Sequence, residues 1–413
     1  MWYLNIIEYL RFILATGVFC SIAWLLSENK GNISIKLIIR GILVQIFLAL
    51  LMLKVEFMAN ALIAANNGLQ VIVRSTNKAV SFCFGGLANP PKELGFIFAL
   101  QGLPMLITVS AISALLMHWR ILPFIINTIS KFFRYTMKIG GTLGVGVSTN
   151  IFTGLSETPL IMKHYLDKLT RSELLSLMMC GAAGVSGTVM LVYSEIISPL
   201  IEAPLHHIIS SAAIGVPTSL IISRMIIPES SSQLTEGGDI NTKYKYHSNI
   251  DALYTGIMDG AKVIAVVIPV LMGFIAVIDV ANSILGNVQI GNEPLSLQMI
   301  LGFLCAPLAW LVGIPWQEAT TVGSLIGIKT IMNEIIGFQE LVNVSGQLSQ
   351  KSTLISIYAI CGFANIASTG TLVGLYGILI PEKIKDVAKM APIAIIGGMI
   401  SNLMTASVIS MII

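Results

Sequence analysis

Charged residues are scarce in this chain. Of its 413 residues only 11% are Asp, Glu, Lys or Arg, whereas 55% are hydrophobic, and the mean hydropathy is +0.85. A soluble globular domain carries about 25% charged residues, and a water-soluble core of this size has no room for so large an apolar excess. The composition therefore excludes a soluble domain. The net charge of +3 says little about partners, and we expect the lipid bilayer and a substrate but no nucleic acid.

Cysteine patterns and hydrolase motifs are missing as well. The five cysteines are scattered, mostly within apolar runs, without the spacing of a metal site or a disulfide framework. No HExxH, intramembrane Ser/His pair or paired-Asp motif accompanies the acidic residues, and no filter-like ring of carbonyls or charges suggests a channel. An intramembrane hydrolase that uses Glu157 and Glu334 is thus a remote alternative. We expect neither enzymatic activity nor a cofactor.

Long apolar runs are abundant instead. About 20 apolar residues suffice to cross the ~30 Å hydrocarbon core of a bilayer as a helix. Placing Lys and Arg of the connecting loops mostly in the cytoplasm favours an orientation with both termini outside. The pattern predicts an all-α polytopic membrane protein with eight transmembrane helices, at residues 6–26, 37–53, 96–116, 173–196, 207–227, 263–285, 352–378 and 390–412.

Two further apolar segments are interrupted by polar residues. Lys residues flank segment 142–165 on both sides, so both its ends should lie in the cytoplasm. No Lys or Arg stands just before residue 316 or between Lys329 and Lys351, so both ends of segment 316–340 can lie outside. Each segment also has Asn, Glu and Gly in its middle. We interpret both as re-entrant helical hairpins, whose broken tips must be buried in protein or line a wet cavity. Segment 118–138 mixes aromatic and basic residues and is typical of a helix in the inner interface. Segment 297–312 has the same role on the outer side, or else each of these two is a further span.

The two hairpins resemble each other. Residues 146–157 align without gaps with 323–334, and residues 180–188 of the following span align with 361–369. An odd number of spans separates the hairpins, so the second copy is inverted relative to the first. Inverted repeats with broken helices bind the substrate and coupling ion at the repeat interface, near the bilayer midplane.

This repeat divides the chain into four parts. They are the N-terminal spans at 1–116, a first repeat at 117–228 with the hairpin and the broken span 173–196, a polar cytoplasmic loop at 229–262, and an inverted second repeat at 263–413 with the second hairpin and the broken span 352–378.

A few polar residues at membrane depth carry the expected chemistry. A carboxylate there costs several kcal/mol unless it is paired or solvated. Glu157 and Glu334 therefore predict a water-filled cavity for a polar, uncharged substrate. The alternative is that each carboxylate has a structural role and accepts hydrogen bonds from the backbone at a hairpin break. Asn365 and Ser368 lie one turn apart beside a predicted helix break and either face the same ligand or hold helices together. Phe363 is either core packing or a platform for an aromatic ring.

Oxygen atoms near the first tip suggest a cation site. Asn150 precedes the tip, and broken backbone frees the carbonyl groups of Thr153 and Val185. A small hard cation needs such oxygen ligands.

Several sequence blocks follow one another from about residue 35 to the C-terminus. They are NIFTGLSETPL at 150–160, KLTRSEL at 168–174, APLAWLVGIPW at 306–316, Asn333-Glu334, CGFAN at 361–365 and SNLMTA at 401–406. With these blocks the chain resembles the concentrative nucleoside transporter family.

The resemblance implies a homotrimer in the bacterial inner membrane, with periplasmic termini, that imports nucleosides by sodium or proton symport through an elevator-type mechanism. It also assigns site residues by motif position. The implied nucleobase contacts are Leu155, Ser156, Glu157, Val189 and Phe363, the ribose contacts are Glu334, Asn365 and Ser368, and the cation contacts are Asn150, Thr153, Gly184 and Val185.

Two of these positions depart from the family pattern. Leu155 stands where the family has Gln, so one amide contact to the base is lost. A carrier for a modified nucleoside or another small polar metabolite is therefore an alternative. Gly184 stands where the family has a Ser or Thr ligand of sodium, and a lost ligand weakens a site that depends on the number of oxygens. Sodium remains the expected cation. If protons drive transport instead, Glu157 is the natural carrier.

Overall fold

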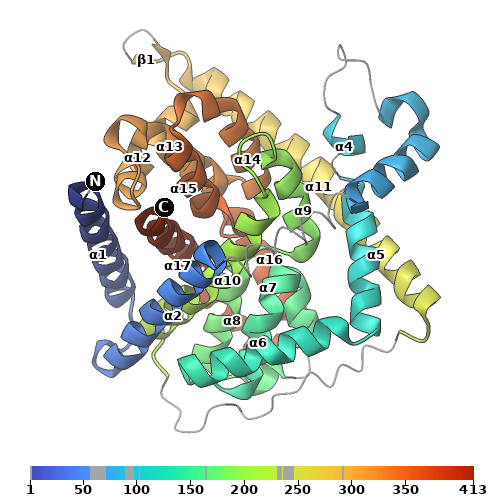
Figure 1. The fold of residues 1–413 in the computed structure, drawn as a ribbon, viewed down its shortest axis with the longest axis horizontal. Helices are drawn as coiled ribbons and strands as arrows, with labels where there is room; N and C mark the ends of the chain where they lie inside the picture. The colour runs from blue at the N-terminus through green and yellow to red at the C-terminus, as the bar shows by residue number, and fades with distance from the viewer. Residues whose placement is uncertain are drawn as a thin grey trace.

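The computed structural model describes residues 2–55, 71–88, 97–101, 103–162, 165–229, 235, 246–290 and 293–413. These residues form a helical assembly (Figure 1). Its strands, in the described part, are the two-residue β1 (Gln289–Ile290) and β2 (Glu293–Pro294), which pair antiparallel. The predicted all-α fold class is confirmed.

The labelled helices follow the predicted order of elements. They are α1 (Trp2–Leu25), α2 (Ile35–Lys54), α4 (Phe98–Gln101), α5 (Met105–His118), α6 (Ile121–Met137), α7 (Gly141–Ile161), α8 (Arg171–Ala183), α9 (Gly187–Ile197), α10 (Pro204–Ile226), α11 (Asn249–Leu285), α12 (Leu297–Leu311), α13 (Trp316–Ile331), α14 (Glu334–Val344), α15 (Gln350–Ile360), α16 (Ile366–Leu379) and α17 (Ile384–Ile412).

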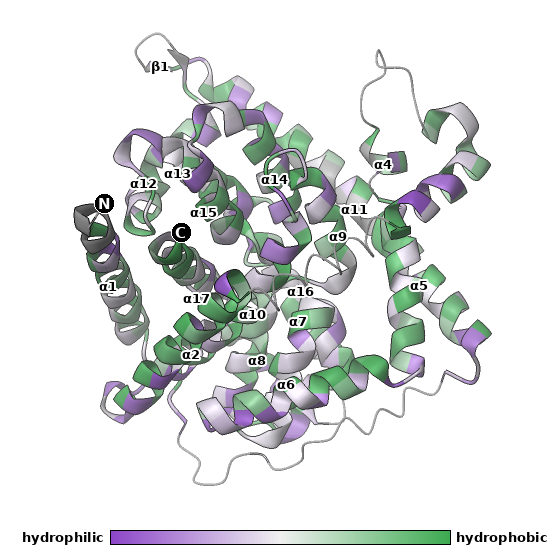
Figure 2. Cartoon of the chain, viewed as in Figure 1, coloured by the Kyte–Doolittle hydropathy of each residue, from purple (hydrophilic) through white to green (hydrophobic). Residues whose placement is uncertain are grey.

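Several of these helices are long enough for a membrane. Among the described residues, five are sufficiently long and apolar to cross one, namely Ile7–Leu25, Ile35–Lys54, Ala99–His118, Pro204–Ile226 and Pro381–Ile412. Hydrophobic residues run along α2 and α5 in Figure 2. The predicted spans 173–196 and 352–378 are each broken into two helices, α8 with α9 and α15 with α16. Segment 297–312 forms α12, which meets α13 at a bend of 116°.

The structure differs from the sequence prediction in two places. A helix at 71–84 was not predicted, because Arg74 and Lys78 interrupt its apolar pattern. The predicted loop at 229–262 is too long, since α11 already begins at Asn249, where the Ser248 side chain caps the helix by accepting from the Asp251 amide (3.2 Å). Most of the remaining loop, and residues 163–164 at the end of the first hairpin, lie outside the described residues.

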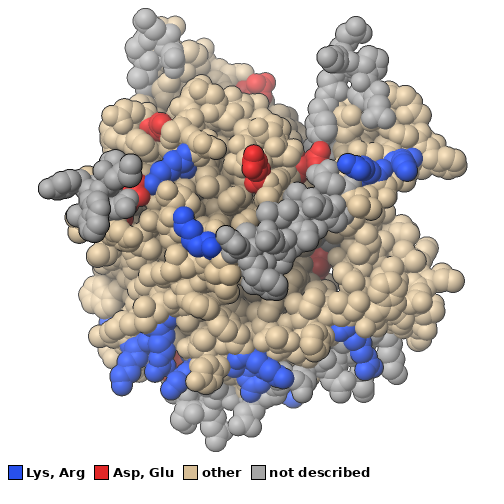
Figure 3. Space-filling model, in the orientation of Figure 1, with Lys and Arg blue, Asp and Glu red and all other residues tan. Residues whose placement is uncertain are grey.

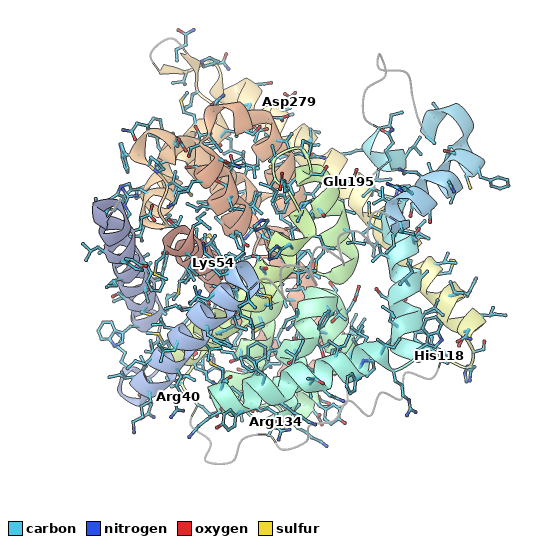
Figure 4. The ribbon with its side chains drawn as sticks, in the orientation of Figure 1. Arg40, Lys54, His118, Arg134, Glu195 and Asp279 are labelled. Carbon is cyan, nitrogen blue, oxygen red and sulfur yellow. The ribbon has the colours of Figure 1, made fainter. Side chains whose placement is uncertain are left out.

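Charged contacts distinguish two opposite faces of the molecule. Arg171, at the start of α8, donates to both carboxylate oxygens of Glu28 in the α1–α2 connection (2.5 and 2.8 Å). Lys351, at the start of α15, pairs with Glu8 near the other end of α1. Lys and Arg gather along the lower edge of the view in Figure 3. Figure 4 places Arg40 and Arg134 at this edge and Glu195 and Asp279 toward the opposite one.

Helices α5 and α11 form a tightly packed pair at one side of the assembly (Figure 1). A Cβ added at Gly256 of α11 would lie 2.6 Å from the Ser110 carbonyl oxygen of α5, and one at Gly260 would lie 2.6 Å from the Ile107 Cα. Two glycines four residues apart thus let the two backbones touch, as in close helix pairs within membranes.

Candidate functional site

The tip of the first hairpin lies against the first broken span. The backbone of α7 breaks at Gly154, which has φ 71° and ψ −164°. A Cβ at this position would lie 2.8 Å from the Ser186 amide nitrogen, in the break between α8 and α9. Only glycine combines this left-handed conformation with so close an approach. The sequence G-L-S-E therefore places its polar residues directly beside the break.

The two broken spans touch each other at their breaks. Gly362 has φ 151°, and a Cβ there would lie 3.0 Å from the Ala183 carbonyl carbon at the end of α8. The amide of Phe363 donates to the Gly184 carbonyl oxygen (3.1 Å). Both repeats thus bring their interrupted backbone to one place, which is the arrangement that the inverted repeat predicts.

Asparagine residues begin two of the helices that follow the breaks. Asn333 caps α14, since its Oδ1 accepts from the Ile336 amide (3.0 Å). Asn365 caps α16 in the same way and accepts from the Ser368 amide (2.9 Å). Asn is among the preferred N-cap residues because its side chain satisfies an amide that the helix leaves free. These caps direct the N-terminal ends of α14 and α16 toward the same region.

Glu334 is the centre of a buried hydrogen-bond network. It is the first residue of α14 and only 4% exposed. The Tyr193 hydroxyl of α9 donates to its Oε1 (2.5 Å), and the Asn365 Nδ2 donates to its Oε2 (3.1 Å). The carboxylate also lies at the positive end of a helix dipole. Elements from both repeats therefore hold this acid in place.

A cavity of about 200 Å³ opens beside Glu334. It lies between the first hairpin tip, the second hairpin tip and the start of α16. The lining residues are Leu155, Ser156, Met332, Asn333, Glu334, Phe363, Asn365, Ala367, Ser368 and Thr371. Most of the residues proposed from the sequence for substrate binding are thus brought together.

Two of the proposed substrate residues are not part of this lining. Glu157 follows Ser156 directly and is half-buried, and the carboxylate of Asp259 on α11 lies within electrostatic range of it. Val189 is partly buried near the start of α9, where its amide donates to the Ser186 carbonyl (3.0 Å). Their place in a substrate site therefore stays a prediction.

The proposed cation residues lie around the first break. Asn150 is 2% exposed, and its Nδ2 donates to the Leu177 carbonyl (3.2 Å), but its Oδ1 is buried without a partner among the described residues. A Cβ added at Gly184 would lie 3.0 Å from the Cys180 carbonyl oxygen and 3.6 Å from that of Asn150. A buried acceptor without a donor, close to backbone carbonyls, fits a hard cation.

The other two cation residues contribute differently. The Thr153 hydroxyl already contacts the Thr149 carbonyl (3.1 Å) and the Thr158 hydroxyl (2.8 Å). Val185 is fully buried in the break. Both can therefore offer backbone carbonyls more readily than side-chain groups.

Sequence reasoning missed several residues of the site. Tyr193 was not singled out, although a buried tyrosine hydroxyl normally requires a partner. Lys329 of α13 was also missed and is fully buried. Met332 and Thr371 line the cavity without any sequence signal. Asn333 had a signal, because an Asn directly before an acidic helix start is typical of an N-cap.

Comparison with known proteins agrees with this geometry. Family models described as "Na+ dependent nucleoside transporter N-terminus", "Nucleoside recognition" and "Na+ dependent nucleoside transporter C-terminus" match residues 14–87, 99–200 and 207–410. The nucleoside permease NupC of Helicobacter pylori is 31% identical over 96% of this chain and 96% of its own. The chain belongs to the concentrative nucleoside transporter family.

Other members of this family support the assignment. The putative nucleoside permease NupX of Escherichia coli is 30% identical over 97% of this chain and 98% of its own. The solved structure of CNTnw in an inward-facing substrate-bound state has a TM-score of 0.90 and 32% identity, covering 98% of this chain and 97% of that one. This concentrative nucleoside transporter is therefore a multi-pass membrane protein of the bacterial inner membrane that serves nucleoside transport. It is not an enzyme, as the sequence predicted.

Proposed function

We propose that the chain imports nucleosides together with sodium. The observation that carries this proposal is the buried Glu334 in the cavity wall between the two hairpin tips. An ionised carboxylate offers about four lone-pair positions, and Tyr193 and Asn365 each donate to one oxygen. The positions that remain suit the two neighbouring hydroxyls of a ribose, with Ser368 on the same wall.

The opposite part of the cavity suits a nucleobase. Leu155 and Phe363 line it and provide an apolar surface for the face of a planar ring. Ser156 lines it too. Glu157 follows Ser156 directly in the chain, and Val189 on α9 is hydrogen-bonded to Ser186, which lies against the hairpin tip, so both are expected to reach the base when the hairpin moves. Because Leu155 cannot form a hydrogen bond, we keep a modified nucleoside or another small polar metabolite as the second candidate substrate.

The coupling cation is assigned to the first break. The Oδ1 of Asn150, which has no partner among the described residues, is the strongest argument, because an amide oxygen can bind a cation but cannot carry a proton. Under proton coupling the carrier would instead be Glu157, three residues after the break. Backbone carbonyls of Thr153 and Val185 complete the set, and Gly184 contributes no hydroxyl. Sodium would enter with the nucleoside as cargo and leave with it on the inner side.

We further propose an elevator motion of one part of the chain against another. The hairpins and broken spans pack together with α10 and α17, whereas α5 packs most extensively against α11 and less against α9. The first group would carry the cavity across the membrane while the pair α5–α11 stays in place. A homotrimer, as the family resemblance implies, would keep that pair fixed.

The charged contacts support an orientation with both termini in the periplasm. The face with the Arg171–Glu28 pair and the Lys and Arg of the lower edge in Figure 3 would be cytoplasmic. The face with the Lys351–Glu8 pair would be periplasmic.

The test is uptake into proteoliposomes that contain the purified protein. Labelled uridine and adenosine are offered under an inward sodium gradient, an inward proton gradient or no gradient. We expect accumulation under the sodium gradient. Asn150→Leu should abolish the sodium dependence, while the exposed Asn343→Leu, which loses only a contact to Glu340, should leave it unchanged. Accumulation under the proton gradient alone would refute the cation assignment, and no accumulation of any nucleoside would refute the import function.

A further inference from the structure

Lys329 is a lysine without exposure to solvent. It lies on α13, one turn before the break that follows Ile331, and its relative exposure is 0%. Its Nζ has no hydrogen-bond partner among the described residues. Lysine is almost never fully buried unless it is paired, because removing an ammonium group from water is costly. The burial therefore calls for a compensating negative charge nearby.

The base of the Lys329 side chain packs against α14. A Cβ added at Gly337 of α14 would lie 3.2 Å from the Lys329 Cβ and 3.7 Å from the Ile360 Cδ1 at the end of α15. Gly337 lies three residues after Glu334, which puts both on one face of α14. The ammonium group is within electrostatic range of the Glu334 carboxylate. Lys329 thus lies beside the face of α14 that bears the acid of the site.

The first repeat has a related arrangement before its own break. Asn150 lies shortly before the break at Gly154, as Lys329 lies shortly before the end of α13, although the alignment of the two repeats does not pair these positions. A Cβ at Gly181, near the end of α8, would lie 3.5 Å from the Asn150 Oδ1. Among the described residues, the first repeat therefore buries an acceptor without a donor, and the second repeat buries a cation without an acceptor in contact. Both lie near the carbonyl end of a helix, which is the negative end of its dipole.

We propose that Lys329 is a tethered cation that acts as the fixed counter-charge of Glu334. Its ammonium group supplies to the second repeat the positive charge that a mobile cation supplies to the first. It keeps Glu334 ionised and in position, so that the carboxylate can accept hydroxyl groups of the ligand. Lys329 is in this sense a positioning residue. Its link to the ligand rests on the proposed function, whereas its pairing with Glu334 does not.

The pairing is tested by a double-mutant cycle on the purified protein. The thermal unfolding midpoint is measured for the unaltered protein, Lys329→Met, Glu334→Gln and the double variant. Removing one partner of a buried pair is strongly destabilising, so Lys329→Met should lower the midpoint by roughly 5 °C or more. In the Glu334→Gln background the same change should cost much less, because a neutral amide needs no counter-charge. The exposed Lys385→Met should change neither background.

The outcomes separate the proposal from its alternatives. If Lys329→Met lowers the midpoint equally in both backgrounds, or in neither, the lysine has a structural role independent of Glu334 and the proposal is overturned. If the single variant does not fold at all, a double variant that folds supports the pairing and one that does not fold refutes it. Uridine binding to Lys329→Met is measured alongside and should be lost, while a retained affinity would overturn the positioning role. Because unfolding is read without any transport, a failure of the pairing is distinct from a failure of nucleoside import.

Discussion

Replacing Asn365 by Asp separates two tasks that one side chain performs. The Oδ1 of Asn365 caps α16 by accepting from the Ser368 amide (2.9 Å), and its Nδ2 donates to Glu334 (3.1 Å). Asp retains the first contact, because Asp is as good an N-cap as Asn. It loses the second, because a carboxylate has no hydrogen to donate. The substitution therefore leaves the helix start intact and removes the support of the acid in the site.

The size of the effect follows from the lost contact. A hydrogen bond to a charged group contributes about 1.5–3 kcal/mol. If Glu334 depends on this bond to hold the ligand, nucleoside affinity should fall about 10- to 150-fold, at 1.36 kcal/mol for each factor of ten. The loss is largest at a pH where both carboxyl groups are ionised, because a proton shared between them would restore a hydrogen bond. The unfolding midpoint should fall as well, since the same contact supports the buried Glu334 in the protein without ligand.

Equilibrium binding of labelled uridine to the purified protein in saturating sodium measures this loss. Asn333→Asp is the matched control, because it places a carboxylate at the neighbouring cap, on the wall of the same cavity, without removing a contact to Glu334. It should weaken binding less than Asn365→Asp. An Asn365→Asp protein that binds uridine as tightly as the unaltered one would refute the role of the Asn365–Glu334 contact. Equal losses in the two variants would attribute the effect to added charge alone.

Three further substitutions test other parts of the site. Leu155→Gln adds an amide to the cavity wall and should change the ratio of uridine to adenosine uptake by roughly fivefold, since one new hydrogen bond contributes about 1 kcal/mol. An unchanged ratio would place the base elsewhere. Gly184→Ser adds a hydroxyl near the Cys180 carbonyl, with a small shift because the Cβ would lie 3.0 Å from that oxygen. It should lower the sodium concentration for half-maximal uptake by roughly fivefold, again about 1 kcal/mol, and an unchanged sodium dependence would remove Gly184 from the cation site. Gly362→Ala places a side chain at φ 151° against Asn402 and Ala183, so it should destabilise the protein by about 1–3 kcal/mol through backbone strain alone and abolish nucleoside binding. The control Gly370→Ala, with no atom within 4 Å of the added Cβ, should leave the free energy of unfolding unchanged. A Gly362→Ala protein as stable as the unaltered one would contradict the contact between the two breaks.

The sequence determined the class of protein and the positions of its breaks. Apolar runs with few charges indicate membrane helices without any tertiary information. Placing a charged side chain in the hydrocarbon core costs free energy at that position, whichever residues surround it in the fold. Polar residues within such a run are costly there, so Glu334 and Asn365 could be singled out as site residues from the chain alone. The break beside Asn365 was also predicted from the chain, and the structure has it at Gly362, whereas the exact break of the first hairpin, at Gly154, came from the structure. The helix at 71–84 was not predicted because its basic residues interrupt the apolar pattern.

Only the tertiary structure decided which groups meet. Tyr193 is far from Glu334 in the sequence, and Lys329 is on a different helix. The type of either residue does not reveal that Glu334 is its neighbour, because the contact depends on how the helices cross. The same holds for Glu157, which the repeat pairs with Glu334 but which does not line the cavity where Glu334 lies. The sequence pattern indicates how deep each residue lies in the membrane and how much free energy its burial there costs. Which residues become neighbours depends on the folded chain.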